Sequence, residues 1–131
     1  MSSEQLPITE RRDDPTTEEF SSEGILIRVR RQHCVDAMGP DESGMYEFHY
    51  DYDLFEFSLG GTTLHGRAYS DEPDEAHFLT VEVAGNRDLL TSADLQSPLA
   101  QAAIRYFHRA GRTSLTWHDS ENSVNGYSPI P

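Results

Sequence analysis

Lysine is absent from this sequence, and the ten basic residues other than histidine are all arginines. The absence excludes a Schiff-base lysine, a lysine general base and the lysine of a phosphate-binding loop. Acidic residues number 23, which gives a formal net charge of −13. Because binding to nucleic acid requires a basic surface that displaces counterions, the charge argues against a nucleic-acid partner and favours a basic protein partner.

Cysteine and long apolar runs are also scarce. Cys34 is the only cysteine, so an intramolecular disulfide and a cysteine-rich metal site are both excluded. No apolar run approaches the roughly 18 to 20 residues that span a bilayer, and the N-terminus carries acids where a signal peptide is apolar. We therefore expect a cytoplasmic protein with no membrane partner.

The first part of the chain differs in composition from the rest. Residues 1–22 contain two prolines and six acids without a sustained apolar period, which predicts a flexible acidic tail. Residues 23–131 have the length of one ordinary domain and show no internal boundary. We expect a single α+β domain there.

Alternating apolar residues predict the first strands of this domain. One strand begins at Gly24 and reaches about Val35, and a loop follows over residues 36–44. Gly60 and Gly61 separate two alternating runs, as in a two-residue hairpin turn. This turn predicts Phe57 opposite Leu64 and Phe55 opposite Gly66 on one face, with Glu56 opposite His65 on the other.

The later segments predict a third strand, a helix and a final strand. Residues 76–84 follow a turn at residues 70–75, and we expect three of them to face the core: Leu79, Val81 and Val83. Ser97 and Pro98 mark the start of a helix that stops at Gly111. A strand at residues 113–118 precedes an irregular end. The predicted fold is an antiparallel meander of five or six strands, with one helix packed on one face.

An aromatic row stands out near the middle of the chain. Tyr46, Phe48, Tyr50 and Tyr52 occupy alternate positions, and the apolar phase shifts after Leu54, which predicts a bulge or short turn within residues 50–54. Core packing is the default expectation for this row, but tyrosine is costly in a sealed core and enriched in contact surfaces, so an exposed row is the alternative.

Carboxylates surround this row, because residues 36–56 contain seven acids and no base. Aromatic side chains among carboxylates are suited to an arginine- or lysine-rich partner. The predicted function is therefore a protein-binding module that occludes a basic partner, as an inhibitor or an immunity protein does. The predicted partner-binding residues are Asp41, Glu42, Tyr46, Glu47, Tyr50, Asp51, Tyr52 and Asp53.

Two alternative functions remain open at this point. The first is a small metal-dependent or His/Asp enzyme, with His49, Asp51 and His65 as candidate ligands. The second is a homodimeric accessory domain that binds a small ligand. Since catalytic motifs are absent from the sequence, we expect a non-enzymatic protein without a cofactor, either monomeric or homodimeric.

Overall fold

The hairpin predicted at Gly60 and Gly61 joins two strands of a large sheet. In the computed structural model, which describes residues 5–130, β4 (Phe48–Leu59) precedes the turn and β5 (Thr62–Tyr69) follows it. Gly60 has a φ of +62°, in the left-handed region that glycine adopts without strain. Phe57 lies opposite Leu64 and Phe55 opposite Gly66, so the predicted register is confirmed.

Within residues 5–130 the sheet has nine strands, in the order β1-β3-β4-β5-β6-β8-β9, with β2 also paired to β3 and β7 to β6. The remaining strands are β1 (Ile8–Arg12), β2 (Thr16–Ser22), β3 (Ile25–Met38), β6 (Glu75–Val83), β7 (Asn86–Leu89), β8 (Ser114–His118) and β9 (Tyr127–Pro129). All pairs are antiparallel except β6 with β8. The predicted α+β class is confirmed, but the meander of five or six strands is wrong, because every residue of β1 and β7 is exposed and leaves no apolar alternation to detect.

Helix α1 (Pro98–Arg109) follows a single 3-10 turn, η1 (Asp94–Gln96), and begins where the sequence predicts. The hydroxyl of Ser97 accepts a hydrogen bond from the amide of Ala100 at 3.1 Å, which caps the first turn. Leu99, Ala103 and Phe107 are buried on the side of the helix that meets the sheet. The helix therefore covers one face of the sheet.

The core lies between this face and the helix. The Phe107 ring meets the rings of Phe55, Phe57 and Phe78 at centroid distances of 5.0, 5.2 and 5.4 Å. A Cβ atom at Gly66 would stand only 3.3 Å from the carbonyl oxygen of His77 on β6, so glycine permits the close approach of the two backbones there. Alternate residues of the same strands point to the opposite face, on which residues 5–130 place no helix.

The segment predicted to be a flexible tail forms two strands in the part of it that the structure describes. Strands β1 and β2 both pair with β3, which extends for 14 residues and offers a long edge. Phe20 is the one buried side chain of these two strands. Backbone hydrogen bonds to β3, rather than burial of apolar side chains, hold these two strands in place. Amino-acid composition does not reveal such pairing. Residues 1–4 of the expected tail lie outside the described residues.

The predicted bulge within residues 50–54 is also wrong. Strand β4 pairs without a register shift against β3 from Phe48 to Ser58. The apolar phase changes because the covered face changes along the strand: Phe55 and Phe57 face the helix, whereas Tyr50 and Tyr52 face away from it. Strand β3 also continues to Met38, so the connection begins later than predicted and occupies residues 39–47.

A bulge does occur between β5 and β6, at His65 and Gly66. It places Ala76 and Phe78 in the core and leaves Leu79 half-buried outside it, while Val83 is exposed. Of the three residues predicted to face inward, only Val81 packs against the core. The irregular end predicted after residue 118 contains the short strand β9, which pairs with β8.

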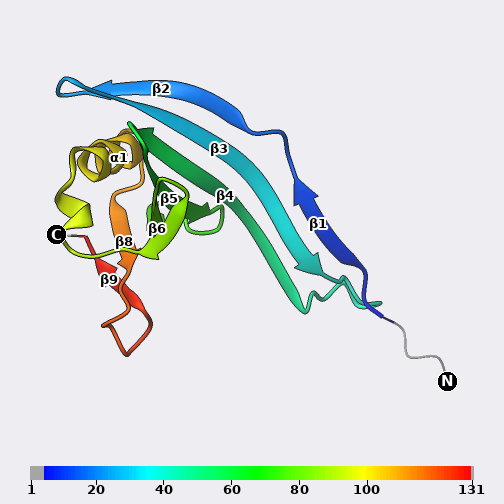
Figure 1. Cartoon of the computed structure of the whole chain (residues 1–131). Helices are drawn as coiled ribbons and strands as arrows, with labels where there is room; N and C mark the ends of the chain where they lie inside the picture. Colours follow the sequence, from blue (N-terminus) through cyan, green and yellow to red (C-terminus); the bar gives the residue numbers. More distant parts are fainter. Residues whose placement is uncertain (1–4, 131) are drawn as a thin grey trace.

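Part of the sheet projects as an arm from the rest of the molecule (Figure 1). The arm consists of β1, the end of β3, the loop 39–47 and the beginning of β4, and its base joins the body that holds α1, β5, β6, β8 and β9 (Figure 1). Among residues 5–130, no helix has the length and apolar character needed to cross a bilayer.

Candidate functional site

An aromatic ladder crosses the face of the sheet that α1 leaves free. Its members come from β4, β5, β6, β8 and β9, and are Phe48, Tyr50, Tyr52, Tyr69, His77, His118 and Tyr127. They share a face because the register places Tyr52 opposite Tyr69, and His118 opposite Tyr127. The ladder thus connects the arm to the far edge of the body.

Neighbouring rings of the ladder are in contact range from end to end. Tyr50 lies 5.6 Å from Phe48 and 6.3 Å from Tyr69 between ring centroids. Tyr69 lies 6.2 Å from His77, which in turn lies 5.4 Å from Tyr127. These separations are those of interacting aromatic pairs. The predicted row therefore lies on a surface, and none of its residues belongs to the buried core.

The ladder is half-buried at its centre and open at the arm. Tyr50 is 52% exposed, whereas burial, aided by a hydrogen bond to Asp36, raises the pKa of Tyr52 to about 12. The guanidinium of Arg67 lies 5.4 Å from the centre of the Tyr69 ring. Tyr50 consequently offers the most accessible ring of the three.

A notch opens where the arm leaves the body. It is a cavity of about 310 Å³, lined by His49, Tyr50, Asp51, Tyr69, Asp71 and Glu72. In this region β4 extends beyond its pairing with β5. The last contact between the two segments is a 2.9 Å hydrogen bond from the amide of Ser70, which follows β5, to the carbonyl oxygen of Asp51 on β4. The free edge of β4 allows residues from both of its faces to reach the same cavity. The notch is therefore lined by two tyrosines, three acidic residues and no arginine, and the carboxylate of one of these acids, Asp51, contacts His33.

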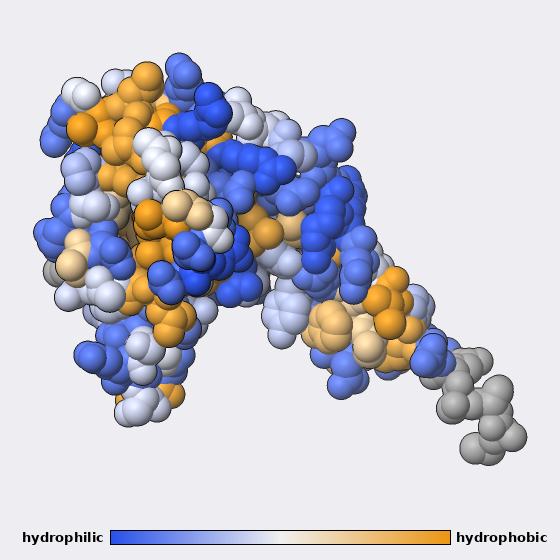
Figure 2. Space-filling model, viewed as in Figure 1, coloured by the Kyte–Doolittle hydropathy of each residue, from blue (hydrophilic) through white to orange (hydrophobic). Residues whose placement is uncertain are grey.

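The tip of the arm carries apolar side chains within an acidic loop. Ile8, Met45 and Tyr46 are exposed there, and apolar residues gather at this end of the arm (Figure 2). Asp41 shapes the loop, because its carboxylate accepts hydrogen bonds from the amides of Ser43 and Met45, each at 2.9 Å. The Ser43 hydroxyl bond and these amides lower the pKa of Asp41. Glu42 and Glu47, both predicted partner-binding residues, are exposed in the same loop.

Asp51 and Asp53 lie on the helix-facing side of β4, away from Tyr50 and Tyr52. His33 bridges two carboxylates there, with its Nε2 2.7 Å from Asp51 and its Nδ1 2.9 Å from Asp13. The contacts with Asp51 and then Asp13 raise the pKa of His33. Because Asp13 follows β1, this bridge fastens the N-terminal segment to the arm.

The metal ligands predicted from the sequence do not come together. His49 is exposed in the arm, whereas His65 pairs with Glu56 in the body, where burial and then Arg87 lower its pKa. His65 points to the helix-free face and Asp51 to the other one. His49, Asp51 and His65 therefore form no metal site.

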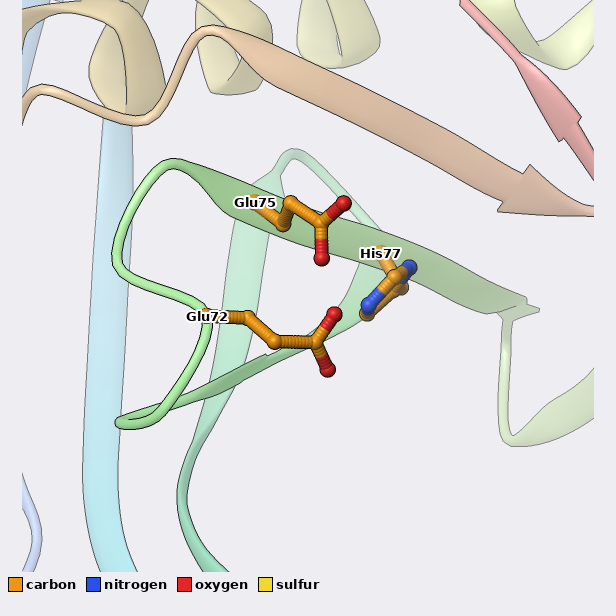
Figure 3. A group of neighbouring side chains, drawn as sticks. All are labelled: Glu72, Glu75 and His77. Carbon is orange, nitrogen blue, oxygen red and sulfur yellow. The ribbon is translucent and has the colours of Figure 1, made fainter.

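Another group of candidate ligands includes His77 of the ladder (Figure 3). The side chains of Glu72, Glu75 and His77 point toward one another, and their ligand atoms lie within 4.8 Å of each other. The contact with Glu75, with burial and the nearby Asp71, raises the pKa of Glu72 to about 7. From the sequence these acids lie in the turn predicted at residues 70–75, whereas in the structure Glu75 and His77 stand two residues apart on one strand and share a face.

Comparisons with family models, curated proteins and solved structures found no match for this chain. The functional argument therefore depends on the notch, the ladder and the arm.

Proposed function

We propose that this chain is a protein-binding module that occludes a basic partner, in the manner of an inhibitor or an immunity protein. The observation that carries the proposal is the notch, where Tyr50 and Tyr69 lie beside Asp71 and Glu72. We propose that an arginine side chain of the partner enters it. Carboxylates bind a guanidinium through paired hydrogen bonds, and an accessible tyrosine ring stacks on its plane.

Two features of the surroundings support a protein partner over a small cation. The apolar tip of the arm, with Ile8, Met45 and Tyr46, provides the kind of exposed apolar area that protein interfaces bury. A hollow separates the arm from the body and would admit a protruding segment of a partner (Figure 2). The arm itself is braced by the Asp13–His33–Asp51 bridge and by the ion pair of Arg12 with Asp36 at 2.9 Å. A braced surface loses less conformational entropy when it binds.

Charge adds to the attraction over a longer range. The net charge of −13 includes seven acids and no base in residues 36–56. Such a field accelerates encounter with a basic protein and weakens as salt is added. We therefore expect salt to slow association more than it speeds dissociation.

The experiment that tests the proposal is affinity capture from the native cells, followed by measurement of the dissociation constant for the purified partner. Asp71→Arg places a positive charge in the notch and should weaken binding at least tenfold, and Tyr50→Ala should weaken it as well. Asp88→Arg makes the same change of charge on β7, away from the notch, and should leave affinity within about twofold.

Two results would contradict the proposal. One is an acidic or neutral partner whose affinity does not depend on salt. The other is equal loss of binding in Asp71→Arg and Asp88→Arg, which would show a general charge effect without a specific notch. The mass of the free protein in solution separates a monomeric inhibitor from the homodimeric alternative.

A further inference from the structure

We propose that Glu72, Glu75 and His77 bind a divalent transition-metal ion, with Zn²⁺ as the best match. Glu72 belongs to the loop between β5 and β6, and the other two residues lie on β6 (Figure 3). Their ligand atoms all lie within 4.8 Å of one another, so a small shift of side chains brings them around one ion. The site shares Glu72 with the notch, but the proposal does not depend on partner binding.

The imidazole of His77 is already oriented as a ligand. Its Nδ1 lies 2.6 Å from the hydroxyl oxygen of Thr116, on the adjacent strand β8. This contact leaves Nε2 as the nitrogen available to a metal. Histidine ligands in metal sites are held in the same way, through a hydrogen bond to the nitrogen that does not bind the ion. Thr116 is thus a positioning residue in the second layer of the site.

The backbone that carries the two carboxylates is held by hydrogen bonds from Arg112. Arg112 donates hydrogen bonds to the carbonyl oxygens of Glu72, Pro73 and Glu75, at 3.1, 3.2 and 2.9 Å. The amide of Glu75 donates to the carbonyl of Glu72 at 3.0 Å, which closes the turn. Because these hydrogen bonds of Arg112 go to backbone carbonyl oxygens, the side-chain carboxylates of Glu72 and Glu75 remain free to act as ligands.

The electrostatics of the pair also favour a cation. Two carboxylates at this separation repel each other, and across residues 5–130 no arginine or histidine forms an ion pair with Glu72 or Glu75 within 4.0 Å. A divalent ion between them converts the repulsion into attraction. Glu72 also lines the notch, so the remaining coordination positions are open to solvent.

The ligand set selects the class of metal. One imidazole nitrogen with two carboxylates suits Zn²⁺ and its first-row neighbours, whereas Ca²⁺ takes six to eight oxygen ligands and Mg²⁺ retains water in an octahedral shell. Three protein ligands and an open position form the arrangement found in exchangeable zinc sites. We expect binding of one Zn²⁺ per chain, in preference to Ca²⁺ and Mg²⁺.

The test is isothermal titration of the full chain with Zn²⁺, Ca²⁺ and Mg²⁺ separately. Zn²⁺ should bind with a stoichiometry of one, and Glu75→Gln and His77→Ala should each weaken it at least tenfold. Thr116→Val retains all three ligands and should weaken binding roughly tenfold. Asp74→Asn changes an exposed acid of the same loop, and His108→Gln an exposed histidine of α1, and neither should change the affinity.

A second readout keeps the test decisive if a variant is poorly folded. The X-ray absorption fine structure at the edge of Co²⁺ or Zn²⁺ bound to the wild-type protein should show one imidazole nitrogen ligand together with oxygen ligands. Absence of Zn²⁺ binding in the wild type, or binding that survives both Glu75→Gln and His77→Ala, would overturn the proposal. Tyr50→Ala should leave Zn²⁺ affinity unchanged, so failure of the metal site and failure of partner binding are distinguishable.

Discussion

Side chains on the helix-facing side of β4 should contribute much more to the stability of the fold than side chains on its helix-free side. The substitutions Phe57→Ala and Tyr50→Ala test this difference. Phe57 is fully buried and contacts the rings of Phe55, Phe78, Tyr106 and Phe107. Truncation of a buried phenylalanine to alanine costs about 3 to 5 kcal/mol, because apolar contacts are lost and a cavity remains. Phe57→Ala should therefore remove a large part of the stability of a domain of this size.

Tyr50 lies seven residues earlier on the same strand and points to the other face. Its ring is half exposed and contacts only the partly exposed rings of Phe48 and Tyr69 within the ladder. The loss of such surface contacts costs about 1 kcal/mol. The two variants should consequently differ by at least about 2 kcal/mol, or roughly thirtyfold in the unfolding equilibrium.

Urea unfolding monitored by the fluorescence of Trp117, the only tryptophan, measures both variants. With a slope of roughly 1 to 3 kcal/mol per molar urea, Phe57→Ala should lower the midpoint by at least about 1 M. Tyr50→Ala should lower it far less, with the same slope. If both variants lose similar stability, the ladder belongs to the core and its role as a contact surface is wrong.

Two further predictions concern the arm and the helix. Since folding raises the pKa of His33, its bridge should contribute fully to the free energy of unfolding below about pH 6.5, and this contribution should be lost as the pH rises through the folded-state pKa. An NMR titration of His33 should therefore give a midpoint above about 6.5. A lower midpoint would contradict the bridge. Ser97→Ala should destabilise the protein by about 1 kcal/mol in urea unfolding, whereas Ser97→Gly should cost only a few tenths, and equal losses would show that the cap is unimportant.

The elements with a strong apolar period could be predicted from the sequence. The β4–β5 hairpin and α1 both carry local signals, namely Gly60 with Gly61 and Ser97 with Pro98, and both lie where these signals indicate. Strands β1, β2, β7 and β9 carry no comparable signal. These strands are held by hydrogen bonds to the edges of β3, β6 and β8. Such bonds depend on the length and position of strands elsewhere in the sequence.

The candidate site was predictable only in part for a related reason. The sequence indicates the acidic, tyrosine-bearing segment around Tyr50, and the alternation of β4 correctly separates Tyr50 from Asp51. The contributions of Tyr69, Asp71 and Glu72 to the notch depend on where β5 ends against β4. The metal candidates failed because His65 points away from the face of Asp51, a relation that follows from the pairing of two strands.

The division between phenylalanine and tyrosine supports the proposal that the helix-free face of the sheet is the contact face. The chain has six of each, and five phenylalanines (Phe20, Phe55, Phe57, Phe78 and Phe107) are buried, whereas no tyrosine is. A hydroxyl gives a ring a polar edge that tolerates water and still allows burial against a partner. Because the tyrosines at 50, 52, 69 and 127 form a connected row on the helix-free face, a partner anchored in the notch can extend its contact along the ladder to Tyr127. That row passes His77, so the proposed metal would lie at the border of the same interface.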